Sequence, residues 1–123
     1  MLMQVLCVFI GGGIGSALRF LITAFSRKIF VHSVYGTLCC NLLGCFLIGL
    51  LAVLFAQKFA LFTYLPKPLV VTGFLGGLTT YSTFNLEAFT MIHEGRTFQG
   101  VAYLIITVVL GLLCTYAGYR SAN

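Results

Sequence analysis

Charged residues are scarce in this sequence of 123 residues, and aspartate is missing altogether. Charged side chains make up 7% of the residues, whereas 60% are hydrophobic and the mean hydropathy is +1.08. A soluble domain ordinarily has about a quarter of its residues charged, because its surface must be hydrated. So few charges cannot cover a soluble globule of this size, and we expect lipid to surround most of the surface.

The sequence also lacks the sets of residues that catalysis requires. Glu87 has no second carboxylate in its apolar segment, and His32 and His93 fall in expected loops. No serine–histidine–acid set and no nucleotide-binding motif is present. We therefore expect that this protein is not an enzyme.

Cysteines and cations are present, but neither type forms a recognisable site. The five cysteines lie in apolar segments without the spacing of zinc ligands, which favours a packing role. The net charge of +5 is scattered, and Arg27–Lys28 is the only adjacent cationic pair. Single cations at helix ends suit contact with lipid headgroups, so membrane lipid is the expected partner and nucleic acid is not.

Four stretches are long and apolar enough to cross a bilayer, which takes roughly 20 residues each. They cover about residues 2–24, 35–56, 69–91 and 100–119. The first stretch lacks a basic leader and a small-residue cleavage site, so we expect it to be a retained span and not a signal peptide. Residues 1–123 are thus expected to form a single all-α integral membrane domain of four transmembrane helices.

The cations divide almost evenly between the two expected sides of the membrane. One side would hold Lys58, Lys67 and Arg120, and the other Arg27, Lys28 and Arg96 with Arg19 nearby. An excess of lysine and arginine normally marks the cytoplasmic side. Two interpretations remain open: weak effects select one orientation, or the chain inserts both ways and assembles as an antiparallel dimer.

The third span contains the most unusual segment, residues 72–84. Two adjacent glycines, Gly76 and Gly77, are followed within a few positions by four hydroxyl residues, Thr79, Thr80, Ser82 and Thr83. A glycine pair followed by β-branched residues favours a helix broken at mid-span. Unwound backbone at this depth offers carbonyls to a cation and amides to an anion. The alternative is an intact helix whose hydroxyls bond back to its own carbonyls.

Further polar and aromatic candidates lie in the second, third and fourth spans. Tyr81 and Phe84 share one helix face and could present positive ring edges to an anion, or simply pack. Asn41, one turn after Thr37, is a functional candidate because an amide is costly in a span; an interhelical hydrogen bond is the alternative. A polar stripe, forming either a pore wall or a packing seam, consists of Tyr103, Thr107, Gly111 and Thr115.

Three motifs, one in each of the first three spans, occur together in a known family. Residues 11–20 read GGGIGSALRF, residues 36–44 read GTLCCNLLG, and residues 76–84 read GGLTTYSTF. In this order they resemble the signatures of the Fluc (CrcB) family of fluoride channels. The fourth span is similar to that family in its length and polar stripe.

The resemblance implies an antiparallel, dual-topology homodimer with two pores in the bacterial inner membrane. Its function would be passive export of fluoride, which reduces fluoride toxicity. It also implies a structural sodium ion (Na⁺) at the dimer centre that is not transported. By position, the backbone carbonyls of Gly76 and Thr79 would hold this ion.

The resemblance also assigns residues to the fluoride pathway. Asn41 would donate a hydrogen bond in the pore, and Phe84 and Tyr81 would turn their ring edges toward fluoride. The family usually has phenylalanine where Tyr81 stands, and the added hydroxyl could donate to fluoride or turn toward water. Arg19 would lie near the aqueous vestibule. The polar track would comprise Thr37, Ser82, Thr83, Tyr103, Thr107 and Thr115.

Two other functions are compatible with a small four-span protein. A dual-topology multidrug exporter would need a mid-membrane carboxylate to couple protons to drugs, but the first span has none and Glu87 lies near the end of the third. A non-transporting membrane assembly protein would leave the expected break and the polar stripe without a purpose.

Overall fold

The computed structural model is an all-helical bundle, described for residues 1–30, 33–57 and 66–123. His32 and Lys58, which the sequence places in loops, lie outside the described residues. Three helices are long and apolar enough to cross a membrane, namely α1, α2 and α6. The elements are α1 (Leu2–Phe30), α2 (Val34–Ala56), η1 (Pro68–Leu75), α4 (Gly76–Leu78), α5 (Tyr81–His93) and α6 (Thr97–Ser121).

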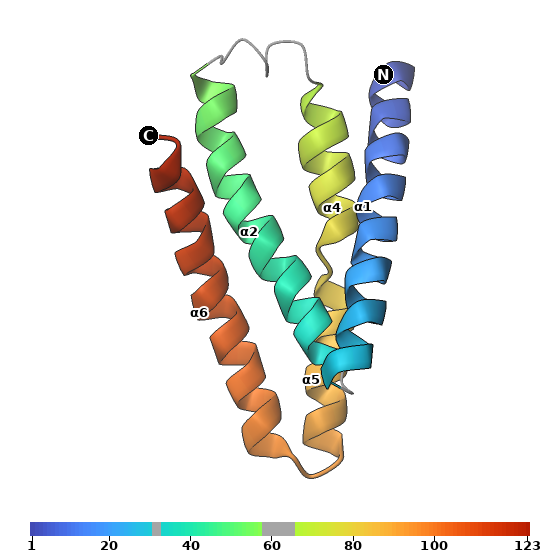
Figure 1. The fold of residues 1–123 in the computed structure, drawn as a ribbon, viewed down its shortest axis with the longest axis vertical. Coiled ribbons are helices and arrows are strands. Elements are labelled where there is room, and N and C mark those ends of the chain that lie inside the picture. Colours follow the sequence, from blue (N-terminus) through green and yellow to red (C-terminus); the bar gives the residue numbers. More distant parts are fainter. Residues whose placement is uncertain (31–32, 58–65) are drawn as a thin grey trace.

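The second helix lies at the centre of the arrangement. Figure 1 shows α6 running along one side of α2, while η1, α4 and α1 lie on the other side. A short turn joins α5 to α6, and these two helices pack against each other as well. The third span is therefore placed between α1 and α2, with its later half also covered by α6.

Glycines allow the backbones of α1 and the third span to touch. A methyl group at Gly11 or Gly15 would collide with the carbonyls of Leu69 and Phe74. Reciprocally, a methyl group at Gly73 would lie 2.9 Å from the carbonyl oxygen of Val8. Close backbone approach of this kind holds helices together in lipid. The hydrophobic effect does not drive their association there, because lipid tails are as apolar as the side chains.

The third span is broken, as the sequence predicts, but the break does not fall at its glycine pair. Gly76 is helical, with φ −62° and ψ −34°, whereas Thr79 (φ −84°, ψ 158°) and Thr80 (φ −149°, ψ 121°) are extended. Gly77 instead gives α1 room, because a side chain there would strike the Gly12 carbonyl. The glycines thus serve close packing, and the β-branched threonines carry the extended backbone.

Two other features of the helices differ from the expected spans. The first helix continues to Phe30, beyond the expected end at residue 24, and its last turn carries Arg27 and Lys28. Cations there interact favourably with the carbonyl end of the helix. The start of the third span, η1, is a π-helix, a wider form that is often found at functional sites.

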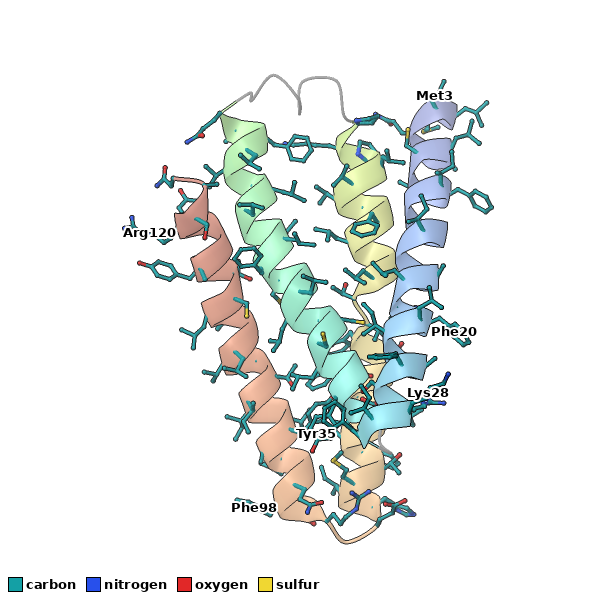
Figure 2. All side chains as sticks on the ribbon, in the orientation of Figure 1. Met3, Phe20, Lys28, Tyr35, Phe98 and Arg120 are labelled. Atoms are coloured by element: carbon teal, nitrogen blue, oxygen red, sulfur yellow. The ribbon has the colours of Figure 1, made fainter. Side chains whose placement is uncertain are left out.

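The outer surface is strongly apolar. Large side chains such as Phe9, Phe20 and Phe98 are more than two-thirds exposed, and Figure 2 shows Phe20 and Phe98 pointing away from the bundle. Lys28 and Arg120 also point outward, near helix ends. An apolar exterior with cations near the helix ends matches the profile of a bilayer.

Candidate functional site

The break in the third span is held by a single side chain from α2. The Asn41 Nδ2 atom donates to the Thr80 carbonyl oxygen at 3.0 Å, and the Thr80 N–H donates to Asn41 Oδ1 at 2.8 Å. One amide therefore satisfies both backbone groups of an extended residue that no helix supports. The interhelical hydrogen bond considered for Asn41 from the sequence is present.

Hydroxyl groups complete the restart of the helix after the break. The Thr80 Oγ1 accepts from the Thr83 N–H at 3.3 Å, so Thr80 caps the start of α5, and it donates to Thr83 Oγ1 at 3.1 Å. The Ser82 hydroxyl lies 3.5 Å from Thr80 Oγ1. On the other side of the break, Thr79 Oγ1 donates to the Leu75 carbonyl at 2.9 Å. The hydroxyl residues of this segment thus stabilise the break itself.

Glycine on α2 makes the approach to the break possible. A side chain at Gly44 would collide with the methyl group of Thr79. This glycine lies one turn after Asn41, so the amide and the opening belong to the same face of α2. The motif in residues 36–44 therefore supplies both the hydrogen-bonding group and the space that the break needs.

An open hollow of about 570 Å³ lies against the break, and we call it the break groove. Apolar residues of α2, η1 and α6 form much of its wall, and no charged side chain is among its described lining residues. Phe84 is buried, whereas Tyr81 is 78% exposed. Seven of the predicted site residues line the break groove: Asn41, Gly76, Thr79, Tyr81, Phe84, Thr107 and Thr115.

Thr107 gives this groove an unusual chemical property. Its side chain is only 8% exposed, and its hydroxyl has no hydrogen-bond partner within the described part of the chain. A buried hydroxyl without a partner costs free energy, so such a group is normally paired with protein, water or a ligand. By contrast, the Thr115 hydroxyl donates to the Gly111 carbonyl at 3.1 Å. Thr107 is therefore a lining residue of the groove whose buried hydroxyl is committed to no described acceptor.

A second polar cluster, centred on Glu87 of α5, was missed by sequence reasoning. Its Oε1 accepts from Ser33 Oγ at 2.8 Å and from Thr37 Oγ1 at 3.0 Å, and its Oε2 accepts from the Tyr103 hydroxyl at 3.0 Å. Thr37 and Tyr103 were expected in a polar track, and here both donate to this carboxylate. The signal was available, because a carboxylate inside an apolar span requires partners.

Ser33, Glu87 and Tyr103 of this cluster line another hollow, of about 740 Å³, which we call the loop-end cleft. It opens beside the turn between α5 and α6, where Arg96 and Phe98 line it. Its polar or charged lining residues are Ser33, Tyr35, Glu87, Thr90, Arg96, Gln99 and Tyr103.

Two aromatic rings separate the groove from the cleft. The Phe84 and Tyr103 rings meet edge to face, with centroids 5.1 Å apart and planes at 70°. Phe84 lines the break groove and Tyr103 lines the loop-end cleft. Tyr81 continues the aromatic row, with its centroid 6.1 Å from that of Phe84. One ring of this pair thus lines each hollow, Phe84 from α5 and Tyr103 from α6.

Four residues expected at the site line neither hollow, namely Arg19, Thr37, Ser82 and Thr83. Thr37 is buried, and its hydroxyl donates to Glu87. Arg19 is half-buried on α1 and makes no hydrogen bond or ion pair with the described residues. Ser82 and Thr83 lie in the exposed first turn of α5, beside the break. Their assignment to a pathway stays a prediction.

Apolar spans around a broken helix, whose extended residues are held by polar side chains, define a multi-pass membrane protein. A family model described as "CrcB-like protein, Camphor Resistance (CrcB)" matches residues 6–119. A protein named "Fluoride-specific ion channel FluC" from Aquifex aeolicus (strain VF5) is 42% identical over 116 residues, covering 94% of this chain and 93% of its own. A protein of the same name from Serratia proteamaculans (strain 568) is 40% identical over 122 residues, covering 97% and 93%.

The chain belongs to the CrcB family. The family resemblance inferred from the motifs in residues 11–20, 36–44 and 76–84 is thereby confirmed. Two of these motifs meet in the structure, because Asn41 of the second holds Thr80 of the third.

Proposed function

We propose that the protein is a fluoride-selective channel that lets fluoride leave the cytoplasm passively and so reduces fluoride toxicity. Relatives that match this chain over nearly its full length carry the name of a fluoride-specific ion channel. The observation that carries the proposal is the free, buried hydroxyl of Thr107 in an uncharged groove beside aromatic rings. Such a groove fits a small anion that must exchange its water for donors and then leave again.

The break groove supplies weak donors of several kinds. Asn41 uses one Nδ2 hydrogen on Thr80, and an amide nitrogen has a second hydrogen that can serve an ion in the groove. The ring edges of Phe84 and Tyr81 carry partial positive charge. Because no lysine or arginine is among the described residues lining the groove, an anion would not be held there by a full charge. This combination favours passage over tight binding.

The proposed pathway runs from the break groove past the Phe84–Tyr103 rings into the loop-end cleft. Thr37 and Tyr103 then form its later part, together with the Glu87 carboxylate that they contact. Arg19 would influence the pathway from outside the two hollows, near an aqueous vestibule. Passive flow needs no bound nucleotide or coupled proton, only donors in sequence along a route.

We further propose that two copies of the chain assemble as an antiparallel homodimer in the bacterial inner membrane. The protomer exposes 8027 Å², compared with roughly 6,500 Å² for a compact soluble protein of this mass. The break groove is open, and the Tyr81 ring at its edge is largely exposed. A second copy would close the groove, and the nearly even distribution of cations supports insertion in both orientations.

A structural sodium ion fits the backbone at the break. The Thr80 N–H is turned toward Asn41, so it does not bond the Gly76 carbonyl as it would in a continuous helix. Thr79 is extended, and Gly76 and Thr79 both line the groove. Uncommitted carbonyl oxygens are suitable ligands for a hard cation, and the carbonyls of Gly76 and Thr79 would hold sodium with the same pair from the second copy. Bound there, the ion would raise the potential for anions.

The channel function is tested by reconstituting the purified protein in vesicles loaded with fluoride. External fluoride should rise rapidly once an ionophore balances the charge, whereas vesicles without protein should retain it. Phe84→Ile should slow efflux severely and leave the oligomeric state unchanged, because it removes only the ring between the hollows. Absence of fluoride efflux through the unmodified protein would overturn the proposal, and proton-coupled drug uptake would support an exporter instead.

Dual topology is tested separately by Asn123→Cys in a cysteine-free background, since Asn123 is exposed at the end of the chain. An impermeant thiol reagent added outside intact cells that express the variant should label about half of the protein if both orientations are present. Labelling of all or none of the protein would show a single orientation and overturn the antiparallel dimer.

A further inference from the structure

We propose that Arg96 collects anions at the mouth of the loop-end cleft and that Glu94 moderates its charge. This inference rests on the proposed fluoride pathway and adds a residue to it that lies outside the membrane-spanning motifs. Arg96 immediately precedes α6, in the turn that joins α5 to α6. It lines the cleft, whose inner end holds Tyr103 and Glu87.

The position of the guanidinium group is set by its neighbours. Gly95 adopts a φ of 82°, which glycine favours, and allows the sharp turn after α5. The Arg96 N–H then donates to the Met91 carbonyl at 2.8 Å. Its Nη2 lies 2.6 Å from Glu94 Oε2, and its Nη1 donates to Gln99 Oε1 at 3.4 Å. The side chain is thus tethered at the rim instead of being free to extend away from it.

The charges that line the cleft make this position important. Within the described residues, Arg96 is the only cation lining the cleft and Glu87 is the only acidic residue. Fluoride that reaches Thr37 and Tyr103 must approach the carboxylate that both of these hydroxyls contact. A cation at the rim offsets that repulsion and raises the local concentration of anions. Glu94, which pairs with Arg96 and does not line the cleft, partly cancels this effect.

The two side chains are exposed enough for salt to control their influence. Their side-chain exposures are 43% for Arg96 and 53% for Glu94. Exposed ion pairs contribute little to stability, so breaking this pair should leave the fold intact. Their field extends about 30 Å at 0.01 M ionic strength but only about 3 Å at 1 M. An effect on anion capture must therefore fade as salt is added.

The test compares fluoride efflux from vesicles at low and high concentrations of an impermeant salt, with fluoride kept well below saturation. Arg96→Gln should slow efflux about threefold at about 0.01 M salt and match the unmodified protein at about 1 M. Glu94→Gln should accelerate efflux at low salt and have no effect at high salt. Lys28→Gln is the matched control: Lys28 is exposed toward the same end of the bundle but does not line the cleft.

Several results would overturn the inference. Equal slowing of Arg96→Gln at both salt concentrations would indicate a structural role, and equal slowing by Lys28→Gln would indicate a general surface charge. No change in Arg96→Gln at low salt would also reject it, while the channel function stood. If the unmodified protein released no fluoride at all, the proposed function would fail and this inference would fail with it.

Discussion

The break groove is lined by Phe84 and the loop-end cleft by Tyr103, and the two hollows differ in whether their hydroxyl groups have hydrogen-bond partners. In the groove, the buried Thr107 hydroxyl has no partner among the described residues. In the cleft, the Tyr103 hydroxyl and two others converge on the Glu87 carboxylate. The groove therefore contains a buried hydroxyl that is committed to no described acceptor, whereas three hydroxyls beside the cleft are committed to the Glu87 carboxylate.

This contrast distinguishes donors that could serve a passing ion from donors that stabilise the fold. A donor that already has a partner contributes to stability, and an ion must displace that partner before using it. A buried donor without a partner costs stability, and the cost is recovered when an ion arrives. Removing the unpartnered hydroxyl of Thr107 should thus affect flux more than stability, whereas substitutions at the partnered residues Asn41 and Glu87 should also lower stability.

The largest effect is expected at Asn41, on which the groove itself depends. Asn41→Leu would leave the N–H and the carbonyl of Thr80 without their partner, at a cost of about 1–3 kcal/mol for each buried group. Fluoride efflux should fall by more than about tenfold, and the thermal unfolding temperature in detergent should drop. Asn85→Ala is the control, because Asn85 donates to the Tyr81 carbonyl at an exposed position. Unchanged efflux in Asn41→Leu would show that the break in the third span is not needed for fluoride passage.

The next largest effect is expected at Glu87, and it should appear first as a loss of stability. Glu87→Ala would leave three hydroxyl donors without their acceptor, and hydrogen bonds to a charged group are worth about 1.5–3 kcal/mol each. The unfolding temperature should fall clearly, whereas Glu87→Gln, which keeps one acceptor oxygen, should lose less. Equal stability of Glu87→Ala and the unmodified protein would show that the cluster does not support the fold.

Thr107 should show the opposite pattern. Thr107→Val keeps the shape of the side chain and removes only the unpaired hydroxyl, so the unfolding temperature should hold or rise. Fluoride efflux should fall about fivefold, as expected for one hydrogen bond worth about 1 kcal/mol. A lower unfolding temperature with normal efflux would reverse the distinction drawn between the two hollows.

The smallest effect is expected from the neighbouring hydroxyl on the same helix. The Thr115 hydroxyl already donates to Gly111 within α6, although Thr115 also lines the groove. Thr115→Val should therefore reduce efflux by less than about twofold, as measured in the same vesicles. A loss of efflux comparable to that of Thr107→Val would show that position in the groove decides the effect and that the unpaired state of the hydroxyl does not.

Much of the fold follows from local patterns in the sequence. Apolar length predicts the spans, whereas the close crossing of α1 with the third span, which uses glycines in residues 11–15 and 73–77, is seen only in the structure. The same glycines are misleading about the position of the break, because Gly76 is helical and Thr79 and Thr80 are extended. Glycine signals both flexibility and close packing, and only the neighbouring helix decides between them.

The candidate site was predictable where one motif contains its parts, and not where distant segments meet. The groove residues of the third span follow one another in sequence, and Asn41 was a candidate by its own chemistry. The role of Glu87, in contrast, depends on hydrogen bonds from Ser33 and Thr37, which lie 54 and 50 positions away in the chain. Sequence can show that a carboxylate in a span needs partners, but the partners are selected by packing.

The central claim, that the two hollows form a pathway selective for fluoride, is tested most directly by comparing two anions in one preparation. Vesicles containing the purified protein would be loaded with equal concentrations of fluoride and chloride, and the efflux of each would be followed with its own electrode. The account predicts rapid loss of fluoride and chloride loss no faster than from protein-free vesicles. Equal efflux of fluoride and chloride would contradict it.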